Sequence, residues 1–121
     1  MRYLLLGMLM PCMIAAAGAT NGQHRAWIEQ FYDSGSLIIL PRVSAGHNAK
    51  LRYELSSIKS DSNGNASTSR QSNSVELTQG QSKTLSRLCL SINPGDRYLL
   101  TLKVYEGTQL VAEDVVTYPT Q

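Results

Sequence analysis

The chain has 121 residues, of which 42% are hydrophobic and 17% are charged, and its formal net charge is +2. This length accommodates a single domain. Without the N-terminal segment that contains Arg2, the chain has 10 basic and 9 acidic residues, so its net charge falls to +1. Such a balance gives no electrostatic basis for binding nucleic acid, and no second apolar run is long enough to cross a membrane.

The N-terminal segment has the pattern of a cleavable secretory signal, in which a basic start precedes an apolar run over residues 4–17. Small residues surround the predicted cleavage point after Ala19, so residues 1–19 are assigned to the signal and residues 20–121 to one exported domain. Cys12 lies in the apolar run, but it follows Pro11, where a lipoprotein signal needs a small residue. We therefore expect no lipid anchor.

Short segments with strand patterning, separated by turn residues, fill the rest of the chain. They cover residues 26–32, 37–43, 50–58, 70–77, 84–92, 97–105 and 110–118.

Two of these segments, and one connection between segments, carry specific signals. Residues 50–58 show the clearest alternation of apolar and polar side chains, which is typical of a half-buried antiparallel strand. Pro41 predicts an edge position or a bulge in the second segment. Asn63-Gly64 predicts a two-residue hairpin turn within a mobile polar tip over residues 60–69.

Seven such segments in about 100 residues, without helical periodicity, predict an all-β fold. The expected architecture is an immunoglobulin-like two-sheet antiparallel β-sandwich of about seven strands. A small barrel is the alternative.

Cys89 is the only cysteine after the signal, so the predicted domain has no internal disulfide. Its neighbours Leu88 and Leu90 favour burial as a small apolar residue. However, Cys89 is out of phase with these leucines, which makes that burial less secure.

No residue pattern indicates catalysis. His24 and His47 have no cysteine, histidine or carboxylate at ligand spacing, so we expect no zinc site and a solvated turn position for His47. Glu113 and Asp114 are adjacent on a predicted strand and therefore point to opposite faces, which prevents them from acting as an acid–base pair. We expect neither enzymatic activity nor a cofactor.

A binding role is the remaining class. The segment 97–105 carries large apolar residues on both faces and is expected to be central in its sheet. Its outward residues combine cations with apolar groups, beside Arg52 of a neighbouring strand, and Val111, Glu113 and Val115 are expected to complete that face. The candidate client-binding residues are Arg52, Arg97, Leu99, Lys103 and Tyr105. An ordinary exposed sheet surface is the alternative interpretation.

Several segments resemble the curli assembly chaperones, specifically the CsgH branch and the related CsgC branch. The resemblance runs from about Trp27 to Pro119. It is carried by Leu51-Arg52-Tyr53-Glu54-Leu55, by Ser69-Arg70-Gln71, by Leu85-Ser86-Arg87-Leu88, by Asn93-Pro94-Gly95-Asp96-Arg97-Tyr98 and by Leu102-Lys103-Val104-Tyr105-Glu106-Gly107.

This resemblance implies a periplasmic immunoglobulin-like domain that prevents amyloid formation by the major curli subunit, without ATP, through transient contacts with an unfolded client. The chain lacks the Cys-X-Cys pair of CsgC-type members, which puts a redox role in doubt. Two other classes stay open: a fimbrial structural subunit, and a sandwich that binds a carbohydrate or another ligand.

Overall fold

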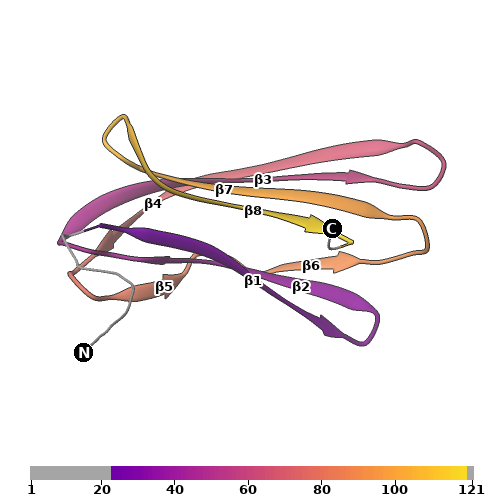
Figure 1. The fold of residues 1–121 in the computed structure, drawn as a ribbon, viewed down its shortest axis with the longest axis horizontal. Coiled ribbons are helices and arrows are strands. Elements are labelled where there is room, and N and C mark those ends of the chain that lie inside the picture. The colour runs from indigo at the N-terminus through magenta and orange to yellow at the C-terminus, as the bar shows by residue number, and fades with distance from the viewer. Residues whose placement is uncertain (1–22, 120–121) are drawn as a thin grey trace, which may run out of the picture.

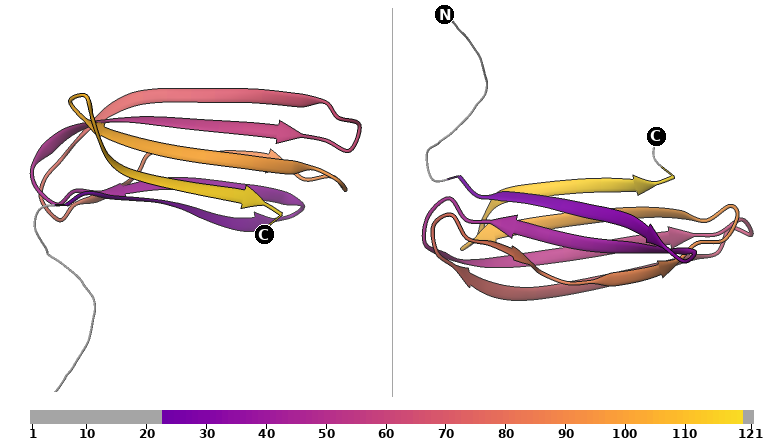
Figure 2. Two further views of the ribbon diagram at one scale, coloured as in Figure 1. Left: turned by 45° about the horizontal axis from the view of Figure 1, so that its top comes forward. Right: turned by 90° about the horizontal axis from the view of Figure 1, so that it is seen from below.

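The computed structural model describes residues 23–119, which form two packed antiparallel sheets (Figures 1 and 2). The eight strands are β1 (Arg25–Asp33), β2 (Ser36–Ser44), β3 (Ala49–Ser60), β4 (Ala66–Leu77), β5 (Ser82–Thr84), β6 (Leu88–Ser91), β7 (Arg97–Glu106) and β8 (Gln109–Tyr118). The predicted all-β immunoglobulin-like sandwich is confirmed, with eight strands where seven were expected. Nothing helical in residues 23–119 has the length and apolar character needed to cross a membrane.

One sheet has the strand order β1-β2-β5, with β6 also paired to β2, and the other has the order β4-β3-β7-β8. In Figure 1 the first sheet forms the lower layer and the second the upper layer. β1 and β8 lie next to each other at the boundary between the sheets, as the right view of Figure 2 shows. β7 is a central strand, as its two apolar faces predict.

The core lies between the two sheets and follows the alternation of the sequence. In β3, Leu51, Tyr53 and Leu55 point inward and are buried. In β7, Leu100 and Leu102 are fully buried, while the intervening residues face outward. Since side chains alternate across a strand, burying one set of these residues fixes the other set on the outer surface.

The predicted strand 84–92 is wrong in one respect, because it is divided into β5 and β6. Both pair with the same side of β2, but residues 85–87 lie opposite only Leu40 and Pro41, so the register shifts by one residue. The Pro41 carbonyl accepts the Leu85 amide at 2.8 Å. Pro41 has no N–H to return a second hydrogen bond on this side, which explains the irregularity there.

Pro41 therefore does not mark an edge strand. β2 is paired on both sides, to β1 and to β5 and β6, and Pro41 lies opposite Ile28 of β1. The predicted bulge is present, but the extra residue belongs to the partner segment rather than to β2.

The hairpin between β3 and β4 also differs from the prediction. Its loop has five residues, 61–65, instead of two, and ladder pairing continues to Ser60 and Ala66. Asp61 closes the loop, because its Oδ1 accepts the amides of Asn63 and Asn65, each at 2.9 Å. Within residues 60–69, Ser60 and residues 66–69 are thus in paired strands and only residues 61–65 form the loop, while the expected mobility of this tip stays a prediction.

Candidate functional site

All five predicted binding residues lie on the outward side of the β4-β3-β7-β8 sheet, which we call the outer face. The ladder register places Arg52 opposite Tyr105 and Ser60 opposite Arg97. From Arg97 to Tyr105 the face extends about 26 Å, at roughly 3.3 Å per residue. The five residues therefore form a row along the sheet rather than a compact pocket.

At one end of the outer face, a cation lies over an aromatic ring. The Arg52 guanidinium carbon is 4.4 Å from the centre of the Tyr105 ring, and Arg52 also donates to Glu54 Oε2 at 2.6 Å. Both partners in this ion pair are nearly half exposed. The arrangement holds the Arg52 side chain against Tyr105 of β7 and leaves it partly exposed to solvent.

At the other end, the outer face is apolar. Ile58 lies directly opposite Leu99, and their exposed fractions are 42% and 38%. Arg97 joins them around a shallow hollow of about 160 Å³. Ile58 continues the outward alternation of β3 after Ser56, so the sequence contained the signal for this residue, although the prediction omitted it.

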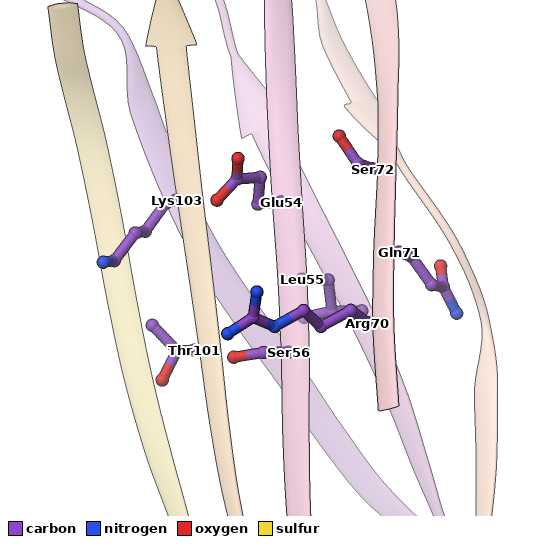
Figure 3. Close-up of a pocket in the computed structure, with 8 residues that line it drawn as sticks. All are labelled: Glu54, Leu55, Ser56, Arg70, Gln71, Ser72, Thr101 and Lys103. Carbon is purple, nitrogen blue, oxygen red and sulfur yellow. The ribbon is translucent and has the colours of Figure 1, made fainter. Parts of the chain in front are cut away.

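Between the two ends lies a larger hollow of about 360 Å³, drawn in Figure 3. It forms because Ser56 and Thr101, which are paired across β3 and β7, have short side chains. Arg70 of β4 reaches over Ser56 toward Thr101, as Figure 3 shows. Arg70 was not among the predicted site residues, since only the register of β4 against β3 places it opposite Ser56.

The last strand contributes less to the outer face than expected. Glu113 lies opposite Lys103, and Val115 lies opposite Thr101 with half of its surface exposed, as predicted. Val111 does not join them, because the register shifts at Tyr105 and Val111 packs against the core instead. A single extra residue next to the β7–β8 turn causes this difference.

The outer face carries an excess of positive charge. Within residues 23–119, none of the ion pairs involves Arg70, Arg97 or Lys103. Lys103 lies between Glu54 and Glu113 in the ladder, but in Figure 3 its side chain extends away from Glu54. These cations can therefore form ion pairs with the carboxylates of a chain that binds to this partly apolar surface.

The two histidines are not isolated, and the prediction that they have no carboxylate partner is wrong. The His24 and His47 rings lie 4.3 Å apart, and each Nε2 is within 3.1 Å of Glu106 Oε1. His24 precedes β1, His47 lies between β2 and β3, and Glu106 ends β7. Sequence spacing gave no signal for this cluster, because the fold brings together three distant segments.

The expected burial of Cys89 is also wrong. Cys89 lies in β6 with a free, exposed thiol, whereas Leu88 and Leu90 pack against the core. The phase of the strand therefore determined its position more than the apolar neighbours did.

Comparison with known proteins links this fold to curli. Residues 18–115 match the protein family described as thin aggregative fimbriae synthesis protein, Tafi-CsgC. The chain is similar in structure to the E. coli curli protein CsgC, with a TM-score of 0.66 and 23% identity, over 82% of this chain and 99% of that one. It is also similar to R. palustris CsgH, with a TM-score of 0.60 and 18% identity, over 75% and 90%. No curated protein sequence matches significantly.

A third similarity, like the two above, concerns the fold. Part of a Bacteroides uniformis beta-glucuronidase superposes with a TM-score of 0.50 and 12% identity, but only 14% of that enzyme is covered. The family match, in contrast, spans most of the 121 residues. The chain therefore belongs to the family of thin aggregative fimbriae synthesis proteins, Tafi-CsgC, and shares the fold of CsgC and CsgH.

Proposed function

We propose that this protein is a periplasmic chaperone-like inhibitor that prevents premature amyloid polymerisation of the major curli subunit. It acts without ATP and below equal concentration with its client, and it is neither an enzyme nor a structural subunit. Membership of the curli-related family supports the choice of client, and the signal pattern of residues 1–19 supports export. The outer face is the single observation that carries the proposal.

The outer face combines apolar side chains with cations, and both can bind an unfolded client. Ile58, Leu99 and Tyr105 offer apolar contacts, while Arg70 and Lys103 offer cations outside the ion pairs of residues 23–119. A length of about 26 Å corresponds to an extended segment of roughly eight residues. Such a segment can rest its apolar groups on the sheet and place its carboxylates beside the cations.

Inhibition at low stoichiometry follows if the contacts are transient and act on growing species. A growing amyloid end presents unpaired strand edges to the next monomer. A protein that occupies the client segment, or the fibril end, for a short time delays every later addition. No hydrolysis of a nucleotide is required, because the inhibitor only has to bind and leave.

The test is thioflavin fluorescence of freshly prepared major curli subunit, with this protein at one-tenth of the subunit concentration. We expect a long extension of the lag phase. Circular dichroism must show that the added protein is folded, and serum albumin at the same mass concentration controls for nonspecific effects. An unchanged lag phase would refute the proposal, and binding to polysaccharide or incorporation into fimbriae would then favour the two other classes.

A further inference from the structure

At one end of the sandwich, two imidazoles and a carboxylate converge. His24 Nε2 is 3.0 Å from Glu106 Oε1, and His47 Nε2 is 3.1 Å from the same oxygen and 3.2 Å from Oε2. One potential ligand atom from each of the three side chains lies within 4.8 Å of the others. They come from the start of one sheet, from the β2–β3 connection, and from the end of β7 in the other sheet.

We propose that His24, His47 and Glu106 bind one zinc ion. Two imidazole nitrogens and one carboxylate form a donor set that proteins use for zinc, with a fourth position for water. At zinc–ligand distances of about 2.0–2.2 Å, tetrahedral ligand atoms lie about 3.3 Å apart. The two nitrogen–oxygen separations, 3.0 and 3.1 Å, are close to that value, and no two of the three ligand atoms lie more than 4.8 Å apart, so side-chain movements can admit an ion. The proposal is independent of the proposed chaperone function.

The burial of the three groups suits a site that forms in the folded protein. The His24 side chain is 2% exposed and is held by the fold, while His47 and Glu106 are 47% and 38% exposed and open the site to solvent. An ion can therefore reach the cluster from the solvent side, through His47 and Glu106.

Zinc binding has one local cost, which also provides a specific signal. The Gly46 amide donates to His24 Nδ1 at 3.1 Å, so the ring proton of neutral His24 is on Nε2 and is directed to Glu106. A zinc ion on Nε2 leaves the ring proton on Nδ1, where it faces the Gly46 N–H, so the two donors must move apart. Gly46 is half-buried, so water can accept from the donors once they have separated.

The expected result of zinc binding is a stabilising link between the two sheets. An ion that binds the folded state and not the unfolded state raises the melting temperature, and the increase grows with the logarithm of the free ion concentration above the dissociation constant. At a free concentration 100 times the dissociation constant, we expect an increase of about 10 °C or more for a domain of this size.

The experiment is calorimetric titration of the untagged, chelator-treated mature protein with zinc chloride, together with thermal melting and amide NMR. We expect saturable binding of one ion, a higher melting temperature, and a large shift of the Gly46 amide resonance. Magnesium, which prefers octahedral oxygen ligands, should have no such effect at the same concentration.

The variants H47A and E106Q test the assignment, because both side chains are partly exposed and their replacement leaves the core intact. Each should weaken zinc binding by tenfold or more, while the control E113Q, at an exposed acid of β8, should bind as the wild type does. The absence of saturable binding, or binding that H47A and E106Q leave unchanged, would overturn the proposal. In either case the three residues form only a hydrogen-bonded cluster.

Discussion

The Asp114 carboxylate accepts a hydrogen bond from the Ile28 backbone amide, with Oδ2 2.8 Å from the nitrogen. Ile28 lies opposite Pro41 in the β1–β2 ladder, but the Pro41 carbonyl points to Leu85 on the other side of β2. The pair is therefore not hydrogen-bonded, and the Ile28 amide points away from β2. A side chain of β8 in the second sheet thus satisfies a backbone donor on the open side of β1.

Replacing this carboxylate should destabilise the fold. D114A leaves the Ile28 amide without its partner, so we expect a loss of about 1–3 kcal/mol in the free energy of unfolding. Urea denaturation measures the loss, and E113A is the matched control, because Glu113 is the adjacent acid and faces solvent. The control should change stability by no more than about 0.5 kcal/mol. Equal effects of the two variants would contradict the role of Asp114.

Two neighbouring leucines of β7 should differ sharply in their contributions to stability. Leu100 is fully buried, whereas Leu99 is 38% exposed on the outer face. We expect L100A to cost about 2–5 kcal/mol through the cavity that it leaves, and L99A to cost below about 1 kcal/mol. Chemical denaturation of both variants tests the register of β7, because a shift of one residue would reverse the order.

The cations of the outer face should be required for inhibition but not for folding. We expect the triple variant R52A/R97A/K103A to extend the lag phase of curli subunit polymerisation much less than the wild type does. The control R25A/K83A/R87A removes the same charge from exposed positions on or beside the other sheet. Thioflavin kinetics compare the two. A folded triple variant with full inhibition would remove these residues from the site.

The loop carboxylate Asp61 should make stability depend on pH in the acid range. Hydrogen bonds from Asn65 lower its pKa below the ordinary value of 3.8. A group with a depressed folded pKa stabilises the fold above its unfolded pKa, and this stabilisation is lost as pH falls through the folded value.

The matched variant for this prediction is D61N, which keeps a side-chain acceptor but cannot titrate. Urea denaturation should show a constant advantage of the wild type from pH 7 to about pH 4.5, and the advantage should shrink as pH falls below 3.8. An advantage that is independent of pH would show that the charge of Asp61 has no role.

The sequence predicted the parts of the fold that depend on alternation. Leu51, Tyr53 and Leu55 were assigned to one face of a strand and are buried, and Arg97, Leu99 and Tyr105 were assigned to the outward side and lie there. Period-two patterning determines which face a residue occupies, so the row of candidate residues could be predicted before the strands were paired.

Features that depend on register could not be predicted in this way. Arg70 lies over the central hollow only because β4 pairs with β3 so that Arg70 is opposite Ser56. Val111 does not lie on the outer face, where it was expected, because the β7–β8 register shifts by one residue near the turn. The cluster of His24, His47 and Glu106 depends on the packing of segments more than 20 residues apart, and no local pattern records such contacts.

The interruption opposite Pro41 has a consequence for the protein's own solubility. It leaves that border of the sheet as two pieces, β5 of three residues and β6 of four, which are offset by one residue. A foreign strand that aligns with one piece is out of step with the other, so it cannot add along the whole border. Short and irregular borders of this kind limit self-association of natural sheet proteins. This border thus offers no continuous template to an added strand.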